Sequence, residues 1–233
     1  MGVVGRRQVL RAGVRSHTRF YRVFNEEVRK YNRTKIAGKF LKVLTVSVKT
    51  FSPDPPTHVR VIYEVDLKGR RPDCICICEF GPNTQIAGAC FIVELKTCKF
   101  VSGTESASKR EQKITGLAQL RDSLALIHTY IPPGTSPLYI CPILVFVSQK
   151  TLKAFKVIRL PPKTIQGNVG GLARTLQGLS TYTVPSKPAR CKKPRKHKHR
   201  CKFTRACGSR APPPTPSSSA SGGLLQTISA LFG

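Results

Sequence analysis

Two short runs of the sequence carry residues that could do chemistry. Pro72-Asp73 opens one apolar segment, and Glu94-Leu95-Lys96 lies near the middle of the next. Side chains two positions apart on a β-strand point to the same side of the sheet, so Glu94 and Lys96 share a face. If the neighbouring strand brings Asp73 beside Glu94, two carboxylates converge in a partly buried place, where their repulsion requires a bound cation or a proton.

A pair of carboxylates in that position would suit a divalent metal ion. Mg²⁺ and Mn²⁺ take oxygen ligands, keep several waters and activate one of them to attack a phosphodiester. Lys96 would orient or help deprotonate that water, or stabilise the charge of the transition state. We therefore predict Asp73, Glu94 and Lys96 as catalytic residues, with Asp73 and Glu94 holding the metal. The alternative interpretation is an ion pair at a strand edge.

The first expected helix, residues 19–31, supplies a candidate third metal ligand. Its apolar residues recur at helical spacing, and Glu27 falls on their stripe. The stripe consists of Phe20, Val23, Phe24, Val28 and Tyr31. An acid that faces inward without a partner is costly, which favours Glu27 over Glu26 as a metal ligand. A surface salt bridge is the alternative interpretation for Glu27.

A second helix, residues 106–130, is expected to flank the site. Its apolar stripe is Leu117, Leu120, Leu124 and Ile127, and Pro132-Pro133-Gly134 ends it. The polar side next to that stripe carries Gln112, Gly116, Gln119 and Ser123. Such a face would lie beside a scissile phosphate, with Gln112 as a candidate catalytic residue and Gly116 permitting close approach. For Gln119, an ordinary solvated position is the alternative.

Five segments with apolar or alternating patterns predict β-strands. They span residues 41–51, 59–67, 73–80, 89–100 and 138–147. Pro142 suggests that the last strand lies at an edge or contains a bulge. Cys74, Cys76 and Cys78 are expected to be small buried hydrophobic residues. The expected order is therefore helix, four strands, helix and strand, within a domain of residues 1–160 followed by a poorly defined extension, 161–186.

The charge of the chain indicates a polyanionic partner. Its 40 Lys and Arg against 11 Asp and Glu give a formal net charge of +29, beyond what solubility needs. Nucleic acid is the first candidate; a generally basic surface and an acidic membrane surface are the alternatives. Nine irregularly spaced Cys and a start without an apolar leader predict free thiols in an intracellular protein. No apolar run reaches the roughly 18 residues of a membrane span.

Residues 187–233 are expected to form a disordered basic tail, because their composition cannot bury enough apolar surface. Between Lys187 and Arg210 there are 11 Lys and Arg and no acid. This run predicts a nuclear or nucleolar localisation signal and an RNA-binding arm. The cations expected to act in it are Lys192, Lys193, Arg195, Lys196, Lys198, Arg200 and Lys202.

Three blocks of the sequence are distinctive when taken together. They are GRRPDC at residues 69–74, FIVELKTC at 91–98, and KREQ at 109–112 with GLAQLRDS at 116–123. Together they resemble the herpesvirus unique-long-twenty-four nuclear protein family, over roughly residues 11–147. The resemblance implies an α/β fold with a PD-(D/E)XK restriction-endonuclease-like core, a mixed central sheet flanked by helices. Asp73, Glu94 and Lys96 would occupy its motif positions.

The resemblance also implies a location and partners. It places the protein in the host nucleus and nucleolus, with the virion as a further location, and makes host nuclear or nucleolar proteins candidate partners. Related PD-(D/E)XK groups often carry Gln-x-x-x-Tyr on the following helix, whereas Gly116 stands four residues after Gln112 here. The role of this glutamine is therefore open.

Two functions follow as hypotheses. The first is a metal-dependent endonuclease that uses Mg²⁺ or Mn²⁺ and acts on or binds nucleic acid in the nucleus. The second is a non-catalytic nucleolar adaptor, in which the same fold is a scaffold and basic surfaces bind nucleic acid or host proteins.

Overall fold

The computed structural model describes residues 3–49, 52, 54–99 and 106–185 of the chain. All of them belong to one compact unit, residues 1–187. The tail predicted for residues 187–233, with its seven candidate cations, lies outside the described residues.

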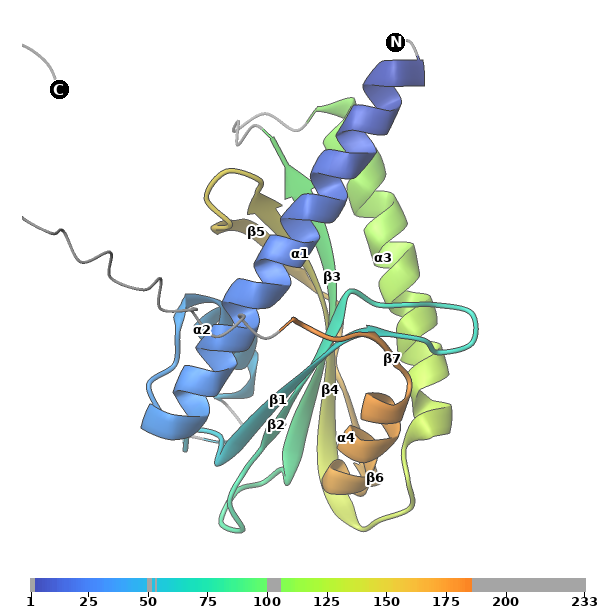
Figure 1. Ribbon diagram of the computed structural model, residues 1–233. Helices are drawn as coiled ribbons and strands as arrows, with labels where there is room; N and C mark the ends of the chain where they lie inside the picture. The colour runs from blue at the N-terminus through green and yellow to red at the C-terminus, as the bar shows by residue number, and fades with distance from the viewer. Residues whose placement is uncertain (1–2, 50–51, 53, 100–105, 186–233) are drawn as a thin grey trace, which may run out of the picture. The chain divides into compact units, whose positions relative to one another are not determined.

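A mixed sheet of seven strands forms the centre of this unit (Figure 1). Six strands form a continuous path, and the seventh, β6 (Lys163–Gly167), pairs with β4. The path runs β5 (Ala154–Arg159), β4 (Ser136–Ser148), β3 (Gly88–Cys98), β2 (Cys74–Glu79), β1 (His58–Val65) and β7 (Ser180–Tyr182). β3 and β4 are parallel, and the other pairs are antiparallel. The fold is therefore mixed α/β with helices flanking a mixed sheet, as expected.

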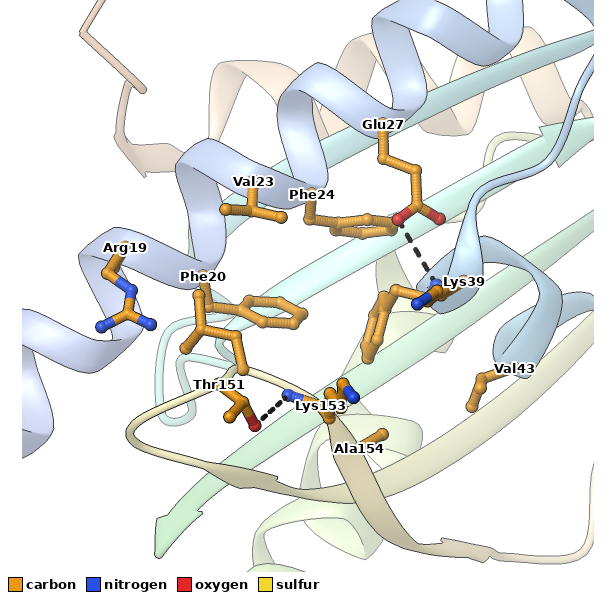
Figure 2. Close-up of a pocket in the computed structure, with 12 residues that line it drawn as sticks. Arg19, Phe20, Val23, Phe24, Glu27, Lys39, Val43, Thr151, Lys153 and Ala154 are labelled. Carbon is orange, nitrogen blue, oxygen red and sulfur yellow. Dashed lines mark hydrogen bonds between the residues drawn. The ribbon is translucent and has the colours of Figure 1, made fainter. Parts of the chain in front are cut away.

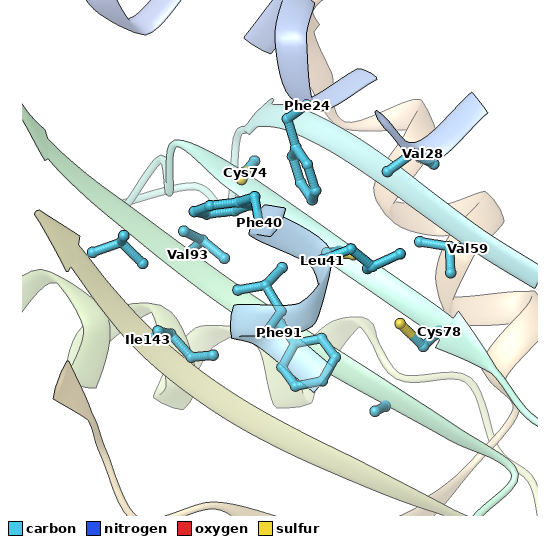
Figure 3. Packing of buried hydrophobic residues seen from close by; sticks show 14 of the residues in the cluster. Phe24, Val28, Phe40, Leu41, Val59, Cys74, Cys78, Phe91, Val93 and Ile143 are labelled. Carbon is cyan, nitrogen blue, oxygen red and sulfur yellow. The ribbon is translucent and has the colours of Figure 1, made fainter. Parts of the chain in front are cut away.

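Helices cover both faces of the sheet because its central strands are apolar on both sides. On one face lie α1 (Val3–Thr34), α2 (Lys39–Thr45) and the short 3₁₀ helix η1 (Val46–Val48). On the other lie α3 (Ala107–Ile127), the 3₁₀ helix η2 (His128–Tyr130) and α4 (Val169–Gly178). Strand β3 contributes Phe91, Val93 and Leu95 to the α1 face (Figure 3) and Cys90 and Ile92 to the α3 face.

Four of the five predicted strands are confirmed as β1, β2, β3 and β4, and the second helix is confirmed as α3. The Ser106 side chain caps α3 by accepting a hydrogen bond from the Lys109 N–H. Pro142 lies in a central strand, opposite Ile92 of β3, rather than at an edge. Its missing N–H faces the gap where the partner of β4 changes from β6 to β5, so no ladder hydrogen bond is lost.

The strand predicted for residues 41–51 is wrong, because α2 and η1 occupy that segment. The alternation of β-branched residues there favours a strand locally. Burial follows a different period: Phe40, Leu41, Leu44 and Val48 are buried, which is helical spacing along one face. Packing of this face against α1 overrides the local preference.

Residues 161–186, predicted as a poorly defined extension, contain β6, α4 and β7. β6 pairs with β4, and β7 pairs with the outer side of β1. The sheet therefore continues well beyond residue 160, the predicted end of the domain. These short strands expose many of their side chains, so their sequences carry little alternating pattern.

Six cysteines are buried and free in the described part of the chain. Among them, Cys74, Cys76 and Cys78 of β2 are fully buried, as predicted, and contribute to the core on the α1 face. No helix in the described ranges is long and apolar enough to cross a membrane.

Candidate active site

Asp73 lies at the start of β2, beside the end of β3 that carries Glu94. Asp73 directly precedes β2, whose first residue, Cys74, lies opposite Val93, so Asp73 lies next to the part of β3 that carries Glu94. One oxygen of Asp73, Oδ2, accepts a hydrogen bond of 2.7 Å from the Leu95 N–H. The prediction that the strand following Asp73 and the strand carrying Glu94 are neighbours is therefore confirmed.

Helix α1 holds the other oxygen of Asp73. His17 Nδ1 lies 3.2 Å from Asp73 Oδ1, and the Tyr21 hydroxyl donates to the same oxygen at 3.3 Å. His17 and Tyr21 are four residues apart and so share one face of the helix. Asp73 is thus held by two elements, by His17 and Tyr21 of α1 and by the Leu95 N–H of β3.

An aromatic cluster fixes the position of Tyr21. Its ring lies 4.6 Å from that of Tyr63 on β1 and 5.2 Å from that of Tyr182 on β7, measured between centroids. The Tyr63 hydroxyl donates a hydrogen bond of 3.0 Å to the Tyr21 carbonyl. The strand β7, which the sequence pattern did not predict, therefore supports a residue that holds Asp73.

Glu94 and Lys96 point toward α3 and form an ion pair. Lys96 Nζ donates to Glu94 Oε1 and to Gln119 Oε1, both at 2.8 Å. The Glu94 side chain is 8% exposed and that of Lys96 is 18% exposed. The shared face predicted for this pair is confirmed, and Gln119 of α3 is its third member.

The protonation of Glu94 is shifted by its surroundings. Burial, followed by the charge of Asp73, raises the pKa of Glu94 to about 7, although Lys96 and His17 partly oppose the rise. Burial alone would lower the pKa of His17, but the hydrogen bond and charge of Asp73 raise it above its ordinary value. Glu94 therefore holds its proton more readily than a solvated carboxylate does.

The absence of a side chain at Gly116 leaves room for the Lys96 side chain. A Cβ atom at this position would lie 2.7 Å from Leu144 Cδ1 and 3.2 Å from Lys96 Cε. Both distances are shorter than ordinary van der Waals contact. A side chain at residue 116 would therefore push α3 away from β4 or displace Lys96, which agrees with the close approach predicted for this glycine.

Gln112 does not contact the carboxylates in this structure. Its Oε1 lies 4.0 Å from Cys98 Sγ, and Gln112 stands about two turns of α3 before Gln119. Gln119, for which a solvated position was the alternative interpretation, instead contacts Lys96. The glutamine that completes the site is therefore Gln119 rather than the predicted Gln112.

Glu27 is far along α1 from His17 and does not join the site. Its Oε1 accepts from the Leu41 N–H at 2.6 Å and its Oε2 from the Phe40 N–H at 3.4 Å, at the start of α2. Figure 2 shows Glu27 pointing toward this end of α2, near Lys39. Gly38 is needed for this contact, since a Cβ there would lie 2.2 Å from Glu27 Cδ. The inward position of Glu27 is explained by two backbone partners, which corrects its prediction as a metal ligand.

Glu27 also borders a mostly apolar cavity of about 530 Å³ between α1, α2 and the loop before β5. Phe20, Phe24 and Phe40 line it, with Lys39 and Lys153 at its rim (Figure 2). Glu26, the other candidate, forms an exposed 3.8 Å pair with Arg29.

The donor set at Asp73 and Glu94 fits a Mg²⁺ or Mn²⁺ ion. Within the described ranges, no three His, Cys, Asp or Glu side chains are arranged to share a metal. Mg²⁺, however, usually takes one or two carboxylates and keeps several waters. A bound cation, in addition to Lys96, would offset the cost of desolvation and the repulsion from Asp73, which together raise the pKa of Glu94. Asp73 and Glu94 are therefore the residues that would hold it.

His17 is the site residue that sequence reasoning missed, and Gln119 is one for which it left a solvated position as the alternative. The predicted helix began at Arg19, whereas α1 extends from Val3 to Thr34. His17 lies seven residues before Phe24, on the same stripe, so extending the period by one turn would have found it. Gln119 was recognised on the polar flank of α3, but its spacing to Lys96 depends on how α3 crosses β3.

Comparisons with known proteins identify the family. A family model described as "Herpes virus proteins UL24 and UL76" matches residues 6–187. The chain belongs to this family. It is 47% identical to Protein UL24 of Human herpesvirus 1 (strain 17), over 99% of this chain and 92% of that protein. It is 36% identical to the Protein UL24 homolog of Varicella-zoster virus (strain Dumas), over 97% of this chain and 96% of the relative.

The UL24 homolog of Equine herpesvirus 1 (strain Ab4p) is also 36% identical, over 77% of this chain and 66% of that protein. No solved structure matches the chain. The family resemblance predicted from the three sequence blocks is therefore confirmed.

Proposed function

We propose that this UL24-family chain is a divalent-metal-dependent nuclease of the PD-(D/E)XK type that cleaves phosphodiesters of nucleic acid in the host nucleus. The observation that carries the proposal is the meeting of Asp73, Glu94 and Lys96 at one end of the β2–β3 pair. Two acids and a lysine so placed form the minimum set for metal-assisted hydrolysis.

Each residue has a distinct role in this proposal. Asp73 and Glu94 hold a Mg²⁺ or Mn²⁺ ion, which when bound supplies a Lewis acid and an activated water. Hydrogen bonds from His17, Tyr21 and the Leu95 N–H keep the Asp73 carboxylate in one orientation. Lys96 stabilises the negative charge that develops on the phosphate, and Gln119 positions the lysine by accepting from it.

The proposed location and wider partners rest on the basic tail and the family. The seven cations of the tail, which lie beyond the described ranges, would direct the chain to the nucleus and nucleolus and bind RNA or DNA. Host nuclear or nucleolar proteins are the other proposed partners, and the virion is a further proposed location.

A second candidate function is a non-catalytic nucleolar adaptor. The observation that favours it is the direct pairing of Lys96 with Glu94 and Gln119, which satisfies both charges without a metal. In that case the site is a structural ion pair, and the basic surfaces carry the function.

Cleavage by the full-length protein distinguishes the two functions. We expect wild-type protein to cleave single-stranded or duplex DNA or RNA in Mg²⁺ or Mn²⁺ and to lose this activity in EDTA. Glu94→Ala and Lys96→Ala should each reduce the rate by about 10³-fold, because they remove a metal ligand and a charge at the reacting phosphate.

A matched control is Glu111→Ala, which removes an exposed acid from the first half of α3 and should retain wild-type cleavage. Filter binding in EDTA would check that the site variants still hold the substrate. Absence of cleavage of all four nucleic acid forms by folded wild-type protein would favour the adaptor.

A further inference from the structure

Helix α1 has an unusual composition of cations. The chain contains 20 Arg and 20 Lys, and α1 alone contains eight of the arginines and one lysine. The two acids of α1 are Glu26 and Glu27, and the Glu27 carboxylate accepts a hydrogen bond from the Leu41 N–H of α2. Either lysine or arginine would keep the exposed side of a helix solvated. The preference for arginine therefore points to a ligand that arginine binds better than lysine does.

Four of these arginines form one line on the outer side of α1. Arg15, Arg22, Arg29 and Arg33 are all exposed, and we call them the arginine ridge. They are separated by seven, seven and four residues. At 3.6 residues per turn they fall within a sector of about 40°, and at 1.5 Å per residue the line is about 27 Å long.

The ridge is scarcely neutralised by the described part of the chain. Within that part, an ion pair joins Arg29 Nη1 to Glu26 Oε1 at 3.8 Å, and both side chains are more than half exposed. Exposed pairs of this kind contribute little and separate readily. Arg19 differs, because it donates to the Lys150 carbonyl at 2.6 Å, and so it is excluded from the ridge.

The chemistry of the ridge fits the phosphates of a nucleic acid. The planar guanidinium binds phosphate oxygens through two parallel hydrogen bonds. A line of arginines matches a ligand whose negative charges repeat along a line. A membrane surface fits poorly, because the apolar side of α1, including Phe20, Phe24 and Tyr31, is buried in the core and cannot enter lipid.

We propose that the arginine ridge binds the sugar-phosphate backbone of the nucleic acid. A strand rising 3.4 Å per nucleotide would place about eight nucleotides along the 27 Å of the ridge. His17 and Tyr21, which hold Asp73, lie on the same helix between Arg15 and Arg22. The inference deepens the proposed nuclease function and rests on it: the ridge would hold a strand along the outer side of the helix whose inner side carries His17 and Tyr21, the residues that hold Asp73.

The experiment compares two fourfold variants of the full-length protein, both with the tail retained. The ridge variant replaces Arg15, Arg22, Arg29 and Arg33 by Gln. The matched control replaces four exposed cations on other elements by Gln: Arg110, Lys150, Lys163 and Arg174. Both lose the same net charge, so general electrostatic attraction falls equally. Affinity for a fluorescent 16-nucleotide single strand, and for the 16-base-pair duplex, is measured in EDTA from 50 to 300 mM salt.

We expect the slope of log affinity against log salt concentration to be shallower by about three in the ridge variant, since each lost phosphate contact reduces the slope by about 0.7 to 0.9. The control should stay within about one of the wild-type slope. A loss confined to one of the two probes would identify that form as the ligand. Shortening the single strand below about eight nucleotides should remove the difference between wild-type and ridge-variant protein.

Equal slopes for the ridge variant and the control, with both proteins folded by circular dichroism, would overturn the inference. The result is separable from the cleavage experiment. If binding depends on the ridge but the wild-type protein does not cleave, the proposed nuclease function is wrong and the role of the ridge in binding stands. If the protein cleaves but binding does not depend on the ridge, the nuclease function stands and the role of the ridge is wrong.

Discussion

Helix α1 meets a buried or half-buried carboxylate at two places, and the two differ in what surrounds the acid. Near its middle, His17 and Tyr21 bind Asp73. Burial, followed by the charge of Asp73, raises the pKa of the neighbouring Glu94 to about 7. Ten residues later, Glu27 accepts hydrogen bonds from the Phe40 and Leu41 N–H groups, at the start of α2.

The difference separates a structural acid from a candidate catalytic one. Glu27 has its charge balanced by backbone donors at the start of a helix, a favourable place for an anion. Glu94 is buried beside Asp73, so its ionised form costs stability, and carboxylates perturbed in this way are concentrated at functional sites. Burial of an acid is therefore a poor guide to its function by itself. The groups that contact the carboxylate decide its role.

Glu94→Gln should give the largest change in stability. The folded-state pKa of Glu94 is about 7 and its ordinary value is 4.5, so ionisation destabilises the fold. This cost is absent below pH 4.5, grows as the pH rises and is complete above about pH 7. Because glutamine removes it, the free energy of unfolding in EDTA should rise by about 3 kcal/mol at pH 8 and change little at pH 4.5.

Urea unfolding at the two pH values, followed by circular dichroism, measures this effect. Addition of Mg²⁺ should stabilise the wild-type protein more than Glu94→Gln. A variant less stable than wild type at pH 8 would mean that the pair with Lys96 outweighs the repulsion from Asp73.

Glu27→Gln should have the opposite sign. One backbone N–H loses a charged acceptor at the start of α2, so the free energy of unfolding should fall by about 2 kcal/mol. The neighbouring Glu26→Gln, which alters an exposed pair, serves as the control and should change stability by less than about 0.5 kcal/mol. Thermal and urea unfolding of both variants, in EDTA and in Mg²⁺, test the assignment. Stabilisation by Glu27→Gln, or a loss of Mg²⁺ response, would return Glu27 to the candidate metal ligands.

Tyr21→Phe should give the smallest effect, because its hydrogen bond to Asp73 is long, at 3.3 Å. We expect a loss of about 1 kcal/mol in stability and a decrease in the cleavage rate of less than about tenfold. Tyr31→Phe removes a hydroxyl that donates to the Pro56 carbonyl, away from Asp73, and should cost stability without lowering the cleavage rate. Equal cleavage rates for the two variants would show that the Tyr21 hydroxyl does not help to position Asp73.

The central part of the molecule was predictable because its signals are local. The apolar runs around residues 73–80 and 89–100 define buried strands, and alternation along the second puts Glu94 and Lys96 on one face. Asp73 lies beside Glu94 because the two strands pair in a register that brings Cys74 opposite Val93. Gly116 and the polar side of α3 follow from helical spacing in the same way.

The remainder depends on contacts between distant segments. Residues 41–48 form a helix because α1 supplies both an apolar surface and the Glu27 carboxylate, and neither is visible within the segment. β6 and β7 are five and three residues long and half exposed, so their partners rather than their sequences define them. The choice between Gln112 and Gln119 depends on the angle at which α3 crosses β3.

The ring contact between Tyr182 and Tyr21 has a practical consequence for truncation experiments. A shortened protein that ends at residue 178 would lose β7 and with it one wall behind Tyr21. Inactivity of such a protein would be misread as a requirement for the basic segment that follows. A protein that ends at Pro185 keeps Tyr182 in place, and is the proper starting point for asking what the last 48 residues do.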